Sequence, residues 1–256
     1  MIAVKGLRKA FGSQQVLRGV DLEVPTGTIT IIIGQSGGGK SVLLKHLIGL
    51  LRPDSGTIAV DGMEISRLRR RALDAVRERY GVVFQGGALF DSMTCGENVA
   101  FPLREKKKIA DDEVARRVEE ALAQVGLAGV GRKYPAEISG GMRKRVAIAR
   151  ALVTEPEIVF FDEPTTGLDP VLVNAIHSVI TDLHQKFHFT AVMVSHEIPE
   201  IFRIADRVAM LHEGRIAAVG TPEEIQTSAN PVVARFIRGE PDDGADSAAD
   251  RSRRNR

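Results

Sequence analysis

The chain has 256 residues, of which 43% are hydrophobic and 27% charged, and its formal net charge at pH 7 is +2. This composition is typical of a folded globular protein, and the nearly balanced charge gives no reason to expect a nucleic-acid-binding protein. The single cysteine cannot form an internal disulfide, which is typical of the reducing cytoplasm.

Neither the start of the chain nor its apolar runs indicate export or membrane insertion. The opening sequence, MIAVKGLRKAFG, lacks the long apolar stretch of a signal peptide. The longest apolar runs, such as Ile29–Ile33 and Ile158–Phe161, are much shorter than the roughly 20 residues that span a bilayer. We therefore expect a protein that serves any membrane process as a peripheral subunit.

The first elements are two strands and a helix. Val16–Val24 alternates apolar and polar residues for much of its length, which predicts a half-buried strand. Thr28–Ile33 is β-branched throughout, which predicts a fully buried strand. A glycine-rich loop and an apolar helical stretch at Ser41–Leu51 follow, and Pro53 and Gly56 end that helix.

Strands and helices continue to alternate along the chain. Further strands are expected at Thr57–Val60, Gly81–Phe84, Glu157–Phe161 and Thr190–Val194, and helices at Asp112–Gln124 and Val171–Lys186. This order predicts an α/β fold with a mostly parallel sheet covered on both faces. From about residue 88 to 153 there are helix signals and no convincing strand, which indicates an inserted helical subdomain. We expect one domain over residues 1–238 and a charged, disordered tail over 239–256.

The loop after the second strand matches the phosphate-binding pattern G-x-x-x-x-G-K-[ST]. Glycines let the backbone curl so that several N–H groups converge on a phosphate, and the following helix adds its partial positive charge. We expect Lys40 to reach the β- and γ-phosphates of ATP and Ser41 to bind Mg²⁺. A plain glycine-rich turn would not explain Lys40-Ser41 in a strand–loop–helix context. The predicted ATP-binding residues of the loop are Gly34, Gln35, Ser36, Gly37, Gly38, Gly39, Lys40, Ser41 and Val42.

A pair of carboxylates follows the apolar run Ile158–Phe161. Asp162 suits the Mg²⁺-binding role of a Walker B aspartate. Glu163 is then placed to orient or deprotonate the water that attacks the γ-phosphate. An apolar run that ends in Asp-Glu is common by itself, but with a P-loop earlier in the chain it predicts a nucleotide hydrolase.

The segment Ile138–Met142 resembles the LSGGQ signature of ABC ATPases, and it precedes the Walker B strand as it does in that family. Ser139 can cap the following helix, and the two glycines expose backbone N–H groups at its start. In the family this surface binds the γ-phosphate held by a second, facing copy. The resemblance therefore implies a dimer in which Ser139, Gly140 and Gly141 act on the partner's ATP.

Other landmarks of that family follow in order. Gln85 matches the Q-loop glutamine, which contacts Mg²⁺ and the attacking water, and Asp169 matches the D-loop at the dimer interface. His196 matches the switch histidine that contacts the γ-phosphate. Phe11 takes the place of the aromatic residue, usually tyrosine, that stacks on adenine. Over roughly residues 2–238 the resemblance implies a P-loop NTPase fold of the ABC type, with an N-terminal antiparallel β portion and an inserted helical subdomain, and ATP and Mg²⁺ as cofactors.

Two features resemble the Mla-type, MCE-associated phospholipid transport ATPases. Met142 stands where most ABC proteins have glutamine, and the segments Gly86–Thr94 and Glu97–Glu105 look like that subgroup. The segment after the Q-loop faces the membrane subunit in ABC transporters. The resemblance implies a multi-spanning permease, an MCE-domain protein and a STAS-domain protein as partners, at the cytoplasmic face of the inner membrane. Its cargo would be a phospholipid or another hydrophobic molecule.

Three other functions compete with this interpretation. An importer ATPase for a polar solute such as an amino acid would have the same catalytic motifs, but Met142 and the segment after Gln85 argue against it. DNA-repair ABC proteins carry a long coiled coil and translation-type members two cassettes, and this chain has neither pattern. A non-catalytic nucleotide-binding module is opposed by the intact Lys40, Asp162 and Glu163.

Overall fold

A computed structural model of the chain describes residues 1–106 and 109–240. Its strands are β1 (Ile2–Phe11), β2 (Gln14–Val24), β3 (Ile29–Ile33), β4 (Ser55–Val60), β5 (Met63–Glu64), β6 (Tyr80–Val83), β7 (Ile158–Asp162), β8 (Thr190–Val194), β9 (Arg207–His212) and β10 (Arg215–Gly220). Its helices are α1 (Lys40–Leu47), α2 (Arg70–Arg77), α3 (Cys95–Lys106), α4 (Asp111–Gln124), α5 (Gly140–Leu152), α6 (Pro170–Phe187), α7 (Pro222–Gln226) and α8 (Pro231–Arg238), with short 3₁₀ turns η1 (Pro135–Glu137) and η2 (Glu200–Arg203).

The central sheet has six strands in the order β10-β9-β3-β8-β7-β6. The strands from β9 to β6 run parallel to their neighbours, and β10 pairs antiparallel with β9 at one edge. The mostly parallel sheet predicted from the sequence is therefore confirmed. This arrangement places the carboxyl ends of five strands at the same edge of the sheet.

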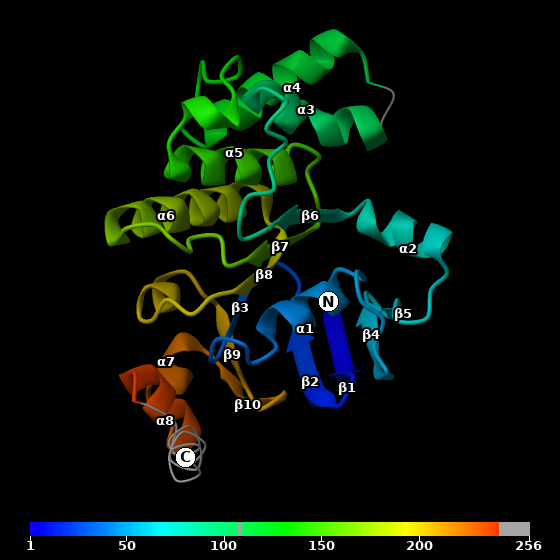
Figure 1. Cartoon of the computed structure of the whole chain (residues 1–256), viewed down its shortest axis with the longest axis vertical. Coiled ribbons are helices and arrows are strands. Elements are labelled where there is room, and N and C mark those ends of the chain that lie inside the picture. The colour runs from blue at the N-terminus through cyan, green and yellow to red at the C-terminus, as the bar shows by residue number, and fades with distance from the viewer. Residues whose placement is uncertain (107–108, 241–256) are drawn as a thin grey trace, which may run out of the picture.

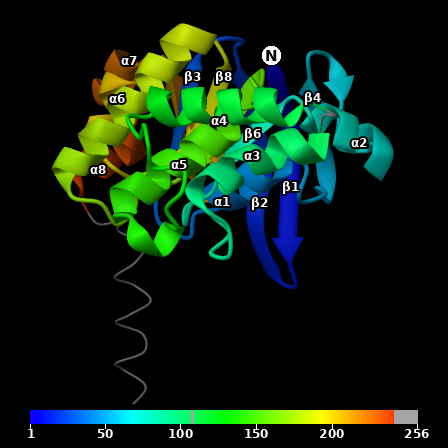
Figure 2. The ribbon, with the colours of Figure 1, turned by 90° about the horizontal axis from the view of Figure 1, so that it is seen from above.

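The two faces of the central sheet pack against different layers. Along β3, Ile31 and Ile33 belong to a hydrophobic core shared with α3, α4, α5 and α6, whereas Ile32 belongs to a core shared with α1, β1, β2 and β4. The alternation follows from the two-residue period of a strand, which sends successive side chains to opposite faces. Figures 1 and 2 show α3, α4, α5 and α6 grouped on one side and the antiparallel strands β1, β2 and β4 on the other.

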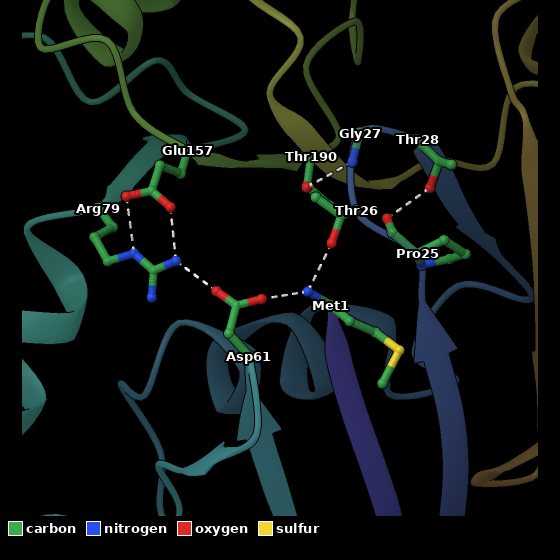
Figure 3. Close-up of polar contacts among 9 residues, drawn as sticks. All are labelled: Met1, Pro25, Thr26, Gly27, Thr28, Asp61, Arg79, Glu157 and Thr190. Atoms are coloured by element: carbon green, nitrogen blue, oxygen red, sulfur yellow. Dashed lines mark hydrogen bonds and ion pairs between the residues drawn. The ribbon is translucent and has the colours of Figure 1, made fainter.

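The smaller sheet has the order β2-β1-β4-β5 and is antiparallel, as predicted for the N-terminal β portion. A polar network ties it to the amino-terminal edge of the central sheet. Asp61, in the turn between β4 and β5, accepts hydrogen bonds of 2.5 Å from Arg79 and from the Met1 ammonium group, and Arg79 also pairs with Glu157 at 2.6 Å (Figure 3). The network lies at the opposite ends of β6 and β7 from the carboxylates Asp162 and Glu163.

The helical part of the chain lies between β6 and β7. Helices α3, α4 and α5 follow one another with no strand among the described residues from 95 to 152. Helix α3 contacts α4 and α5, and α5 in turn contacts α6 and β6, so α5 joins the helical layer to the sheet (Figure 1). Within the described residues, no helix has both the length and the apolar character needed to cross a membrane.

Two boundaries can be compared with the sequence predictions. Helix α1 ends at Leu47 and not at Leu51, because Gly49 adopts a left-handed conformation (φ 80°) and its N–H donates to the carbonyl of His46 at 2.9 Å. Gly49 therefore ends the helix before Pro53 can. At the other end of the chain, α8 ends at Arg238 and Gly239 caps it with φ 69°. Most of the predicted tail, residues 241–256, lies outside the described residues.

Candidate nucleotide site

The site is built at the carboxyl ends of four adjacent parallel strands, β3, β8, β7 and β6. Val194 of β8 pairs with Ile32 of β3 on one side and with Asp162 of β7 on the other, so these ends are level with one another. The loops that leave such ends meet in a common crevice. The register therefore brings the glycine-rich loop, the Asp162–Glu163 pair, His196 and Gln85 to one place.

The glycine-rich loop between β3 and α1 depends on glycine at two close approaches. Gly34 has φ 150°, and a Cβ there would lie 2.2 Å from the carbonyl oxygen of Leu211. Gly39, the N-cap of α1, has φ 96°, and a Cβ there would lie 3.0 Å from the side chain of Val16. The loop therefore passes close to neighbouring strands before it opens at the N-terminus of α1.

The loop forms the floor of a cavity of about 320 Å³. Its lining residues are Phe11, Val16, Ser36, Gly37, Gly39, Lys40, Ser41, Val42, Gln85 and Glu163. All but Val16 were predicted from the sequence as site residues. Phe11 is 46% exposed, as a side chain that must stack on an incoming ring would be.

Lys40 is buried, with 4% of its surface exposed. Its Nζ donates to the backbone oxygens of Gly34 and Gln35 at 2.8 and 2.9 Å, so the ammonium group lies across the loop. Burial lowers the pKa of Lys40, and the nearby carboxylates of Glu163 and Asp162 oppose that shift. A cation at the N-terminus of α1, where the helix adds its partial positive charge, can bind a polyphosphate.

Ser41, which lines the cavity, lies next to Asp162 at the end of β7. The Ser41 hydroxyl donates to Oδ1 of Asp162 at 2.9 Å. Mg²⁺ prefers oxygen ligands at 2.0–2.1 Å in octahedral geometry, which places neighbouring ligands roughly 2.9 Å apart. The two oxygens therefore fit adjacent positions around a magnesium ion.

Glu163 is held by its backbone conformation and by three neighbouring side chains. It has φ 48°, a conformation that residues other than glycine seldom adopt. Its carboxylate accepts hydrogen bonds from the Gln85 amide at 3.1 Å and from the Thr166 hydroxyl at 3.0 Å, and lies 3.4 Å from Nδ1 of His196. The side chain of Glu163 is 17% exposed and lines the cavity, whereas His196, 44% exposed, does not line it and lies next to it through its contact with Glu163.

The predicted signature and D-loop residues lie at helix starts away from this cavity. Ser139 caps α5 by accepting from the N–H of Met142 at 3.3 Å. Asp169 caps α6 by accepting from the N–H groups of Val171 and Leu172 at 3.0 Å. Ser139 and Asp169 are exposed, Gly141 is buried, and none of the three lines the cavity. Within one chain the structure does not bring these residues to the nucleotide site.

Three residues of the site were not predicted. Val16 lines the cavity from β2, Thr166 holds Glu163, and Lys144 donates to the backbone oxygen of Gln85. Thr166 follows the carboxylate pair by three residues, which is a local signal. Val16 and Lys144 come from distant elements and carry no such signal.

Comparison with known proteins shows what the chain is similar to. A sequence model described as "ABC transporter" matches residues 17–166. The probable ribonucleotide transport ATP-binding protein mkl of Mycobacterium leprae is 44% identical over 93% of this chain and 69% of that protein. The intermembrane phospholipid transport system ATP-binding protein MlaF of Haemophilus influenzae is 40% identical over 94% of this chain and 92% of that protein.

A solved structure with a similar fold is the dimeric ATP-binding cassette MJ0796 in a post-hydrolysis state with ADP and phosphate. It has a TM-score of 0.79 and 30% identity, and the match covers 87% of this chain and 99% of that chain. The chain spans about two thirds of the mycobacterial relatives, with 66% of the Mycobacterium tuberculosis protein covered.

Proposed function

The chain belongs to the ABC transporter family and is an ATP-hydrolysing subunit of that family, and from this premise we propose that it energises the transport of phospholipid between membranes. The catalytic part of the proposal is carried by one observation. The loops at four parallel strand ends bring Lys40, Glu163 and Gln85 to the lining of a single cavity, and Asp162 is hydrogen-bonded to Ser41 of the same lining.

Each residue of this cavity has a proposed role. Lys40 and the loop N–H groups would hold the phosphates of ATP, and Ser41, Asp162 and Gln85 would hold Mg²⁺. The ion would neutralise negative charge on the phosphates. Glu163 accepts a proton from the attacking water. His196, whose Nδ1 lies 3.4 Å from the Glu163 carboxylate and which is the more exposed of the two, contacts the γ-phosphate.

The site is incomplete in one copy, so we propose that it works as a dimer. Family members form dimers, as in the cassette MJ0796. Ser139 and Asp169 are exposed at the N-termini of α5 and α6, where a facing copy can meet them. A helix start that presents free N–H groups attracts a phosphate, which supports a role for Ser139, Gly140 and Gly141 on the partner's ATP.

The domain boundaries belong to the same proposal. We assign residues 1–238 to the ATPase domain, and about 88–153 to its helical subdomain. Among the described residues from 95 to 152, α3, α4 and α5 follow one another without a strand, which supports the bounds proposed for the helical subdomain.

The phospholipid cargo is inferred through the partners. The relative MlaF is named for an intermembrane phospholipid transport system and matches this chain over 92% of its own length. We propose a multi-spanning permease, an MCE-domain protein and a STAS-domain protein as partners, with the chain bound peripherally at the cytoplasmic face of the inner membrane. The segment after Gln85 carries Phe90, which leaves 42% of its surface exposed although its ring lies 5.0 Å from that of Phe101. An exposed aromatic residue there suits a contact with a membrane subunit.

Ribonucleotide transport is the competing function, because mkl is named for it and has the higher identity of the two. A ribonucleotide is a polar solute, and the catalytic motifs alone do not exclude transport of a polar solute. The two functions share every residue of the ATP site. Only the associated membrane proteins and the cargo separate them.

Affinity purification of the full chain in mild detergent tests this proposal. We expect a permease and a membrane-anchored MCE-domain protein to co-purify, with phospholipid detected in the complex by mass spectrometry. Replacing residues 86–105 with the matching stretch of an amino-acid importer ATPase should break assembly and leave ATP binding intact. Recovery of a polar-solute permease with a soluble binding protein and no MCE-domain protein would refute the lipid assignment while the ATPase assignment stands.

A further inference from the structure

Helix α5 carries a buried cation close to its exposed start. Lys144 is the fifth residue of α5, which begins directly after Ser139, and only 9% of its surface is exposed. A buried ammonium group is costly unless it is paired and hydrogen-bonded. The proposed function gives this residue no role, so its partners indicate what it does.

The partners of Lys144 are parts of the hydrolysis site. Its Nζ donates to the backbone oxygen of Gln85. Burial lowers the pKa of Lys144, and the carboxylates of Glu197 and Glu163 oppose that shift by their negative charge. Glu197 is itself fixed, because it accepts a hydrogen bond from Thr165. Lys144 thus joins α5 to the loop after β6 in the electrostatic field of two carboxylates.

A second cation of α5 holds the same loop further along. Arg150 donates to the backbone oxygens of Gly87 and Ala88 at 2.6 and 2.7 Å. Beyond them, the side chain of Asn98, fully buried in α3, donates to the backbone oxygen of Phe90 at 3.0 Å. The backbone from residue 85 to 90 is therefore anchored to α5 by the buried Lys144 and the half-buried Arg150, and to α3 by the buried Asn98.

From Gln85 the connection continues to the carboxylate that we place next to the attacking water. The Gln85 amide donates to Oε2 of Glu163 at 3.1 Å, so a shift of the Gln85 backbone moves a hydrogen bond of Glu163. We propose that Lys144 is a positioning residue for hydrolysis: it holds Gln85 so that the Gln85 amide orients Glu163. This inference rests on the proposed role of Glu163 in ATP hydrolysis.

The arrangement has a consequence for the dimer. The start of α5 is where the facing copy meets this chain in the proposed function, and Lys144 lies little more than one turn further along the same helix. Engagement of Ser139 by the partner's ATP would then be transmitted to Glu163 through α5, Lys144 and Gln85. A position error of about 1 Å in a catalytic group can lower a rate roughly 100-fold, so a single donor is sufficient to matter.

A double-mutant cycle in the purified transporter complex tests the proposal. The variants are Lys144→Met, Gln85→Ala and their combination, with Lys144→Arg as the conservative variant that keeps a cationic donor. We expect Lys144→Met to lower kcat about 10- to 100-fold while KM for ATP stays within about threefold. The kcat of the combined variant should lie within about twofold of that of Gln85→Ala. Both substitutions interrupt the same connection from Lys144 through Gln85 to Glu163, so their effects should not multiply. Lys144→Arg should recover most of the lost rate.

The matched control is Arg145→Met, which removes a cation from the next position of α5. Arg145 is half-buried and its side chain lies near Gly126, away from Gln85, so kcat should stay within about twofold of the parent. If Lys144→Met fails to assemble, the cycle is repeated with Lys144→Gln, for which the same non-additivity with Gln85→Ala is expected.

Several results would overturn the inference. One is that assembled Lys144→Met has the same kcat as the parent. Another is that the fold-decrease in kcat of the combined variant equals the product of the fold-decreases of the two single variants. If Gln85→Ala loses rate and Lys144→Met does not, only the role of Lys144 is refuted. If Gln85→Ala keeps the parent rate, the role of Gln85 in the proposed function and the inference are both refuted.

Discussion

Replacing Glu163 by glutamine removes the proposed base while preserving nearly all of its contacts. In the structure the Gln85 amide and the Thr166 hydroxyl both donate to Oε2, and a side-chain amide oxygen at position 163 can accept both. The left-handed backbone of residue 163 is unaffected by the change, because glutamate and glutamine have the same shape. We therefore expect the variant to fold, assemble and bind ATP as the parent does.

The expected loss lies in the rate of hydrolysis. A positioned general base contributes about 10²- to 10⁴-fold, which corresponds to roughly 2.7–5.5 kcal/mol of activation free energy. Phosphate release by the purified complex measures the rate, and binding of a fluorescent ATP analogue measures affinity. ATP trapped in the variant should also stabilise the dimer, which size-exclusion chromatography with and without ATP can follow.

The matched control is Glu157→Gln, the same chemical change at the other end of β7. Glu157 is 62% exposed and pairs with Arg79 far from the nucleotide cavity, so its loss should change stability by less than about 1 kcal/mol and leave kcat within about twofold. Hydrolysis by Glu163→Gln at the parent rate would refute the role given to Glu163. An equal loss in both variants would show that the effect is not specific to the site.

Three further predictions concern the glycine-rich loop and the signature. Lys40→Ala should weaken ATP binding about 10- to 150-fold, since a charge-assisted hydrogen bond contributes roughly 1.5–3 kcal/mol. A dissociation constant for ATP equal to that of the parent would contradict this prediction. Gly34→Ala should destabilise the fold by about 1–3 kcal/mol more than Gly27→Ala. Both glycines have positive φ, but only at Gly34 would a Cβ lie 2.2 Å from a neighbouring carbonyl oxygen. Equal melting temperatures of the two variants would contradict this prediction. Met142→Gln should keep ATPase activity within about threefold, because Met142, in the first turn of α5, packs partly buried on the core and its thioether is only a weak acceptor. Complete loss of activity in a folded variant would assign the side chain a further role.

The central strands could be predicted because their sequences leave little choice. Thr190–Val194 matches β8 to the residue, and the prediction at Thr28–Ile33 differs from β3 by one residue. Both strands are buried on both faces, so neither contains a charged residue and most of their side chains are apolar or β-branched. Elements without such a pattern were missed. Helix α2 packs on the core through Leu73 and Val76 alone, and an apolar face of two residues in an eight-residue helix is too short to stand out among its arginines.

The nucleotide site was predictable to the extent that its chemistry is local in sequence. The glycine-rich loop and the Asp162–Glu163 pair are short motifs whose spacing carries the prediction. The contribution of Lys144 is different in kind. In the sequence it stands between Arg143 and Arg145 and looks like part of a solvated basic face, and only the packing of α5 against the loop at Gln85 buries it. Burial of a charged side chain by tertiary structure cannot be inferred from its neighbours in sequence.

The claim that ATP hydrolysis in this cavity drives phospholipid movement can be measured directly. The complex is reconstituted into vesicles, and transfer of a fluorescent phospholipid is followed with ATP and Mg²⁺ for the parent chain and for Glu163→Gln. We predict transfer that depends on ATP in the parent and falls with the hydrolysis rate in the variant. Transfer of a ribonucleotide but not of phospholipid by the parent, or phospholipid transfer at the parent rate by Glu163→Gln, would contradict the claim.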